Sequence, residues 1–213
     1  MSYVIEDDSI QMVQGRYLRK DDGKEELGKS DEKRLLSNDE VREQFLRWRK
    51  LNYAVWNKLL KRSFVVDNRL YNKEGIINED LLWTFYLIKH LNNAQLCSDV
   101  TYYYYNRPGS ILSGSDAKDI GQSYAIIFNN ILHNLTVGKE KEELRGYEST
   151  FCVVLANYLR LVPELKPVLR LYKRQAKQYD CWTVNFTISA VAIVSHFVNP
   201  MGLMNQLNLM RKN

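Results

Sequence analysis

Cysteine is scarce in this chain, and its three cysteines lie far apart. Cys97, Cys152 and Cys181 form no CxxC pair. This spacing favours reduced thiols in the core of a cytosolic protein over a disulfide framework.

Long apolar runs are missing as well. The longest apolar-leaning stretch, residues 186–198, is interrupted by four polar side chains and falls short of the ~18 residues that a membrane-spanning helix needs. The first ten residues, MSYVIEDDSI, are acidic and lack the apolar segment of a secretory signal. We therefore expect a cytoplasmic protein without a transmembrane helix.

Several common functional motifs are also missing. The chain holds no GxGxxG, GxxxxGK[ST] or GxSxG, and its three histidines have no partners at metal-ligand spacing. The net charge of +5 on 213 residues is too mild to indicate a nucleic-acid binder, which concentrates its charge in one patch. What remains is an ordinary globular composition with enough residues for a sizeable core.

The first half of the chain predicts mixed secondary structure. Residues 10–18 alternate as a strand, and the polar, glycine-containing stretch 19–34 is interpreted as a surface loop. Ser37 and Glu40 form a capping box that opens a helix. Residues 53–64 predict a short extended segment running into a helical turn.

A second helix is predicted to begin at Glu79, with Asn78 as its cap. Its expected buried stripe consists of Leu81, Phe85, Ile88 and Leu91. The tyrosine-rich residues 100–105 predict a strand, and the turn chemistry of residues 106–109 ends it.

Beyond about residue 115 the apolar residues recur at helical spacing, and Pro163 and Pro167 fit the first turn of one of the helices. We therefore predict mixed α/β structure to about residue 112 and α-helices over 113–213. One basic helical face is expected, formed by Arg170, Lys173, Arg174 and Lys177. It fits either a solvated surface or contact with an anionic membrane.

Two adjacent acids, Glu79 and Asp80, lie between apolar neighbours in the segment GIINEDLLW. A carboxylate in the first turn of a helix meets the positive end of the helix dipole and stays ionised. An ionised and partly enclosed carboxylate is suited to act as a general base. Stabilisation of the helix is by itself also a sufficient explanation of this pair.

Aromatic and basic residues near these acids fit a sugar-phosphate site. Trp56, Trp83 and the tyrosine run offer faces that stack on sugar rings, although tryptophans are also ordinary core residues. Arg107 and Lys58 are candidates for contact with a phosphate, and each is equally explained as a solvated cation.

Three segments together are similar to a known family. AVWNKLLKRSFV, EGIINEDLLW and YYYYNRPGSI resemble, in order and spacing, the second half of the catalytic domain of family 2 glycosyltransferases. These are bacterial enzymes of the GT-A fold that build capsule, O-antigen and exopolysaccharide. The resemblance covers residues 10–112, and the combination of segments is more specific than any one of them.

The resemblance implies an inverting transfer from a nucleotide-sugar to a glycan or lipid-linked acceptor. Asp80 would take the proton of the acceptor hydroxyl, with Glu79 beside it as support. Trp56 and Trp83 would line the acceptor side. Arg107 and Ser110 match the closing motif near the donor diphosphate, although Asn106 stands where an arginine is commoner.

The chain also departs from the family pattern. A complete enzyme has a preceding βαβ half with an Asp-x-Asp motif for Mg²⁺ or Mn²⁺, and the acidic pair Asp7–Asp8 lies too close to the first strand to be that motif. We therefore expect an N-terminally truncated glycosyltransferase. Residues 1–112 would be the last part of the catalytic domain and 113–213 a helical extension, with impaired donor and metal binding.

A different class of function is also consistent with the sequence. In this alternative the helical region 113–213 is a non-catalytic interaction module that docks a partner subunit or the inner face of the plasma membrane. The helix that begins at Glu79 is then only structural.

Overall fold

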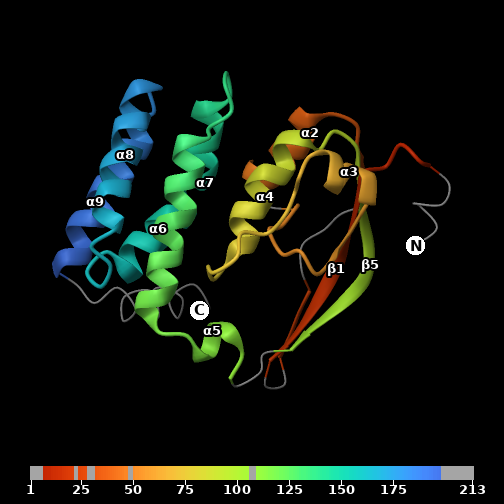
Figure 1. Cartoon of the computed structure of the whole chain (residues 1–213), viewed down its shortest axis with the longest axis horizontal. Helices are drawn as coiled ribbons and strands as arrows, with labels where there is room; N and C mark the ends of the chain where they lie inside the picture. Colours follow the sequence, from red (N-terminus) through yellow and green to blue (C-terminus); the bar gives the residue numbers. More distant parts are fainter. Residues whose placement is uncertain (1–6, 22–23, 28–31, 48–49, 106–108, 198–213) are drawn as a thin grey trace. The chain divides into compact units, whose positions relative to one another are not determined.

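The computed structural model describes residues 7–21, 24–27, 32–47, 50–105 and 109–197 (Figure 1). The chain divides into two compact units. Unit 1 consists of residues 1–75 and 79–114, and unit 2 of residues 76–78 and 115–213. The structure therefore separates the two parts near residue 114, and each unit is described by itself.

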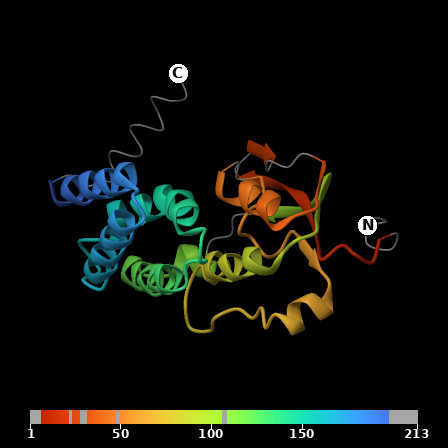
Figure 2. The same ribbon diagram turned by 90° about the horizontal axis from the view of Figure 1, so that it is seen from above.

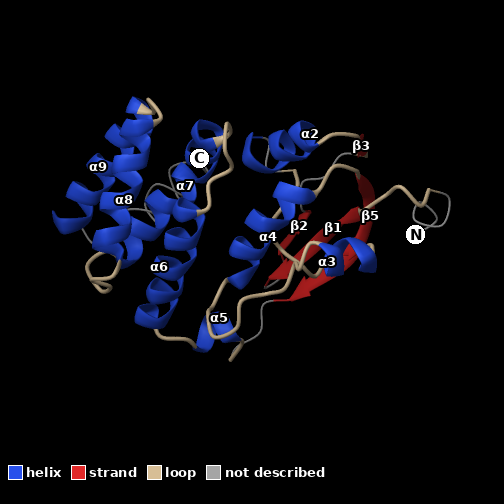
Figure 3. Ribbon diagram, turned by 45° about the horizontal axis from the view of Figure 1, so that its top comes forward, coloured by secondary structure: helices blue, strands red, loops and turns tan. Residues whose placement is uncertain are grey.

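Unit 1 contains a five-stranded mixed sheet with the order β2-β1-β5-β3, in which β4 also pairs with β1. The two long strands, β1 and β5, run parallel, with Met12 opposite Ala94, and the other pairings are antiparallel. Figure 3 shows these strands side by side. The strands are β1 (Met12–Asp21), β2 (Lys24–Leu27), β3 (Lys33–Leu35), β4 (Lys58–Leu60) and β5 (Ala94–Tyr105).

The pairing of β1 with β5 is irregular at Gly15. The register shifts between Gln14 and Arg16, as in a bulge. A Cβ atom on Gly15 would lie 2.1 Å from Oγ1 and 2.4 Å from Cγ2 of Thr101. Only glycine lets the two strands approach this closely.

Short helices surround the sheet in unit 1. They are α2 (Asn38–Arg42), the π-helix η1 (Glu43–Arg47), α3 (Arg62–Asp67), α4 (Glu79–His90) and α5 (Ile111–Gly114). Ser37 caps α2 by accepting the N–H of Glu40, as predicted from the capping box. The predicted stripe of α4 is buried in the core. Asn78 precedes α4 with φ of +62°, not in the extended conformation usual for a capping residue.

The described part of unit 2 is a group of four helices (Figure 2). They are α6 (Ala117–His133), α7 (Glu140–Tyr158), α8 (Leu165–Gln178) and α9 (Trp182–Phe197). Helices α6 and α9 each pack against both α7 and α8. At Gly121 of α6, an added Cβ would lie 2.6 Å from Cγ2 of Val162 and 2.9 Å from Cβ of Tyr158, so this helix comes close to its neighbours because it has no side chain there.

The predicted fold class, an α/β region followed by an α-helical region, is confirmed. The interpretation of residues 19–34 as a loop is wrong, because β1 extends into this stretch, β2 lies within it and β3 begins in it. The last predicted strand begins earlier than expected, at Ala94. Most of the predicted turn at 106–109 lies outside the described residues. No helix in the described ranges is long and apolar enough to cross a bilayer.

Candidate active site

The segment from Lys50 to Lys58 is an irregular loop that polar side chains hold against β1. The buried side chain of Gln14 donates to the carbonyl of Lys50 at 2.9 Å and accepts the N–H of Asn52 at 3.2 Å. The buried amide of Asn57 donates to the carbonyl of Gly15 at 3.0 Å. Because such bonds satisfy backbone groups that no sheet or helix satisfies, they fix the course of this loop.

The first turns of α4 hold the same loop from the other side. Oδ2 of Asp80 accepts the N–H of Val55 at 3.3 Å, and the hydroxyl of Thr84 donates to the carbonyl of Tyr53 at 3.1 Å. Asp80 and Thr84 are four residues apart and therefore lie on one face of the helix. The sequence prediction missed Thr84, although its spacing of four residues from Asp80 already indicated that the two side chains share one face of the helix.

The half-buried Asp80 carboxyl has a raised pKa. Burial is the largest cause, and the neighbouring charge of Glu79 adds to it. The N–H of Val55 and the ammonium of Lys58 act in the opposite direction. The carboxylate is therefore more basic than an exposed aspartate, while a hydrogen bond still holds one of its oxygens in place.

Lys58, at the start of β4, points its ammonium group back into the loop. Its Nζ donates to Oδ1 of Asn52 at 2.9 Å, to the carbonyl of Ala54, and to Oδ1 of Asn57 at 3.3 Å. Burial lowers the pKa of Lys58 to about 7, and the charge of Asp80 raises it. The contact with a phosphate predicted for Lys58 stays a prediction, and a phosphate would have to compete with these three acceptors.

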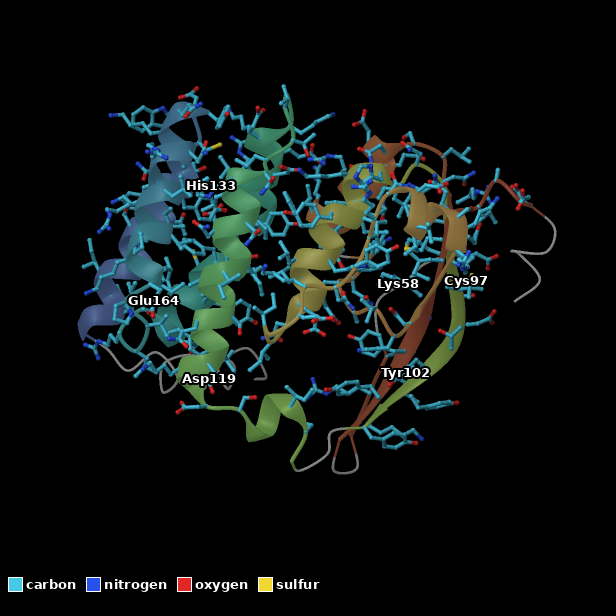
Figure 4. The ribbon with its side chains drawn as sticks, in the orientation of Figure 1. Lys58, Cys97, Tyr102, Asp119, His133 and Glu164 are labelled. Atoms are coloured by element: carbon cyan, nitrogen blue, oxygen red, sulfur yellow. The ribbon has the colours of Figure 1, made fainter. Side chains whose placement is uncertain are left out.

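Trp56, one residue beyond Val55, forms an aromatic cluster with three tyrosines of the sheet. Its ring stacks on Tyr102 at 4.3 Å and on Tyr104 at 5.5 Å, and it meets Tyr17 edge to face at 5.2 Å. The tyrosines come from β1 and β5, and Figure 4 labels Tyr102 among them. Trp56 itself is half-buried, so the cluster combines apolar rings with partial access to solvent.

The cluster also has a cation at its edge. Arg19 lies 5.9 Å from the ring centre of Tyr104, whereas Lys20 lies over Tyr103 on the opposite face of the sheet. Arg19 and Tyr104 are opposite each other in the pairing of β1 with β5. The sequence prediction missed Tyr17 and Arg19, because their place depends on parallel pairing between distant segments.

The other predicted site residues are distributed differently. Glu79 is half-buried beside Asp80, and Ser110 is half-buried at the start of α5, where its carbonyl accepts the N–H of Gly114 at 2.8 Å. Trp83 is only 7% exposed, and its indole donates to the carbonyl of Leu70 at 3.2 Å. It therefore packs in the core of unit 1 and offers little surface to a substrate. Arg107 lies outside the described residues.

A divalent metal site was tested against the residues that the structure describes. In those ranges, no three side chains of His, Cys, Asp or Glu come together to hold a metal ion. Among the described residues, the metal that the family resemblance implies therefore finds no group of three such donors.

The arrangement around Asp80 supports acid–base chemistry on a substrate that carries a ring. Its carboxyl is partly enclosed, has a raised pKa, and is held by the backbone of Val55. The next residue in the loop, Trp56, presents an aromatic surface. A hydroxyl of a stacked sugar could give its proton to such a carboxylate.

The chain matches no protein-family profile, and no curated protein matches its sequence. Among solved structures, it is similar to residues 1–349 of TarS from S. aureus, a wall teichoic acid glycosyltransferase, with a TM-score of 0.45. The two chains are 16% identical, and the match covers 90% of this chain and 59% of that chain. Similarity at this level assigns no function.

Proposed function

We propose that this protein is an inverting glycosyltransferase of cell-surface polysaccharide biosynthesis. Its donor is a nucleotide-sugar, and its acceptor is a glycan or lipid-linked glycan. The observation that carries the proposal is the Asp80 carboxyl, which has a raised pKa and is bonded to the loop that bears Trp56. The three family-like segments in the sequence meet at this place, since they supply Trp56, Asp80 and Tyr102.

In the proposed reaction, an acceptor hydroxyl oxygen attacks C1 of the donor sugar, and the bond from C1 to the diphosphate breaks. Asp80 takes the hydroxyl proton, and the nucleoside diphosphate leaves with the electron pair. The N–H of Val55 holds Oδ2 of Asp80 and thereby fixes the carboxylate for the proton transfer. Trp56 stacks on the acceptor sugar and orients that hydroxyl.

The impaired donor and metal binding that the family resemblance implies remains a prediction. Transferase activity is measured as nucleoside diphosphate released from a radiolabelled nucleotide-sugar. Turnover well above background would support the transferase and would contradict the impaired donor binding that the family resemblance predicts.

The role of Asp80 is tested in a form of the protein with measurable transfer activity. Removal of a general base costs roughly 10²–10⁴-fold in kcat, so Asp80→Asn should lower kcat by that factor. Glu79→Gln is the matched control, because it changes the neighbouring carboxylate in the same turn, and it should cost less than about tenfold. Equal losses in the two variants, or an unchanged rate for Asp80→Asn, would show that Asp80 is not the base.

The alternative of a non-catalytic module is distinguished by ligand binding. A nucleoside diphosphate with Mn²⁺ or Mg²⁺ should raise the melting temperature if a donor site exists, because a ligand of the folded state stabilises it. An interaction module has no reason to respond to this ligand.

A further inference from the structure

Helix α9 of unit 2 presents an apolar face that none of the described residues of this unit covers. Trp182 is 61% exposed, Phe186 is 76% exposed and Ile193 is 61% exposed. The spacing of these residues puts them along one side of the helix. On the other side, Val184 and Ile188 are fully buried against the bundle. Large aromatic side chains on a solvated surface usually mark a contact site.

Helix α8 presents a basic face directly before α9 in the chain. Its exposed residues include Lys166, Arg170, Lys173, Arg174 and Lys177, and the helix itself contains no acid. The buried side of α8 is apolar, so the charges are concentrated on the outer surface.

The two faces are neighbours within unit 2. Helices α8 and α9 pack on each other, and the turn that joins them consists of only three residues, 179–181. Lys177 and Trp182 are therefore close at this turn. The only acid between residues 165 and 197 is Asp180, whereas α7 alone carries four glutamates. Positive charge and exposed aromatic side chains thus lie on two helices that contact each other and follow directly in the chain.

We propose that α8 and α9 form a docking surface for an anionic phospholipid bilayer. Cations beside exposed Trp and Phe are the composition that binds at the interface of a bilayer, where basic groups meet lipid phosphates and aromatic rings enter the headgroup region. The charge on α8 is what favours this occupant over an apolar protein partner. The surface contains no residue of the proposed transferase site and does not depend on it.

Binding is measured by sedimenting the full chain with vesicles. Vesicles of phosphatidylcholine with phosphatidylglycerol in equal parts should pellet the protein, pure phosphatidylcholine should not, and added salt should weaken the binding. With anionic vesicles, the fluorescence of Trp182 should shift to the blue, and this shift should disappear in Trp182→Phe.

Two matched pairs of variants test the surface. Replacement of Lys173 and Arg174 by glutamine should weaken binding by about 30-fold, since each basic residue contributes roughly fivefold or more near an anionic surface. The control replaces the exposed Lys118 and Lys141, on α6 and α7, in the same way. Phe186→Ser should weaken binding by about tenfold or more. Its control is Ile126→Ser, which changes a side chain of α6 that is 40% exposed.

Four results would overturn the proposal. One is a failure to pellet with anionic vesicles at low salt. Another is equal weakening by the test and control variants. The third is self-association that Phe186→Ser abolishes without any vesicle binding, which would assign the face to a second copy of the chain. Binding that appears only after removal of residues 198–213 would also overturn it, because the face would then be occupied in the full chain.

Discussion

The two units bury different kinds of side chain. Among the described residues, the buried polar side chains of unit 1 are Gln14, Arg42, Gln44, Asn57, Thr84 and Gln95, whereas those of unit 2 are Ser123, Glu143 and Ser195. In unit 1 several of these groups hold an irregular loop. In unit 2 the helices satisfy most of their own backbone groups.

This difference separates two ways of building a functional surface. Unit 1 uses interior polar groups to place Asp80 and Trp56, so the proposed chemistry depends on a network that must stay intact. In unit 2 the cations of α8 and the rings of α9 lie on the surface of a bundle. We expect substitution of the buried groups Gln14 and Asn57 to change stability and the proposed activity together, and substitutions of the exposed residues of α8 or α9 to change the proposed membrane binding alone.

The largest effects are expected from Gly15→Ala in unit 1 and Gly121→Ala in unit 2. Each new methyl group would meet atoms closer than 3 Å, and such overpacking costs about 1–3 kcal/mol. Hydrogen exchange followed by mass spectrometry should show Gly15→Ala opening the strands of unit 1 and Gly121→Ala opening the helices of unit 2.

Gly114→Ala serves as the control for both, because its nearest neighbour would be 4.0 Å away. If Gly15→Ala and Gly121→Ala each raise exchange in both units to the same degree, the units unfold as one body and the comparison fails.

The free energy of unfolding should depend on pH because of the ammonium group of Lys58 in unit 1. Burial lowers the pKa of Lys58 to about 7, below its value in the unfolded chain. Between about pH 7 and pH 10.5 the unfolded chain therefore binds a proton that the folded chain does not, so stability rises with pH, by up to about 1.4 kcal/mol per pH unit. Urea unfolding followed by tryptophan fluorescence measures this slope. Lys58→Met should flatten it, and the same slope in Lys58→Met would assign it to another group.

A smaller effect is expected at the turn between α8 and α9. Asp180 has φ of +56°, and the N–H of Cys181 donates to the carbonyl of Ala176 at 2.7 Å, as at a helix end closed by a left-handed residue. Glycine adopts this conformation without the penalty of a Cβ, so Asp180→Gly should raise the free energy of unfolding by about 0.5–1 kcal/mol. Thermal unfolding tests this, and a loss of stability would mean that the aspartate side chain has a structural role.

The smallest effect on stability is expected from Asp80→Asn. The raised pKa of Asp80 means that its ionised form is disfavoured in the folded chain. Its contribution to stability is present at low pH and is lost as the pH rises through that pKa. At neutral pH Asp80→Asn should leave stability unchanged within about 0.5 kcal/mol or increase it. If Asp80 only stabilised the helix dipole, the variant would instead lose about 0.3–1 kcal/mol.

The sequence predicted those parts of the fold that depend on local periodicity. The capping box at Ser37 and the apolar stripe of α4 are local signals, and both appear in the structure. The strands β2 and β3 were missed, because their polar sequences resemble a loop and their pairing with β1 and β5 supplies the order.

The candidate site was predicted only in part, because local sequence signals do not show which distant segments come together. Asp80 and Trp56 were identified from their segments, but nothing local indicates that Tyr17 of β1 meets Trp56. The core position of Trp83 was also open in the sequence, since a tryptophan on a helix fits both a pocket wall and a buried core.

The parallel pairing of β1 with β5 also has a consequence for how the protein forms. Met12 is paired with Ala94, so β1 leaves the ribosome long before β5, its parallel neighbour in the sheet, has been synthesised. Contacts between such distant segments slow folding, whereas the helices of unit 2 contact one another over shorter sequence separations. During synthesis β1 therefore has an unpaired edge and is a site where the nascent chain is exposed to aggregation or chaperone binding.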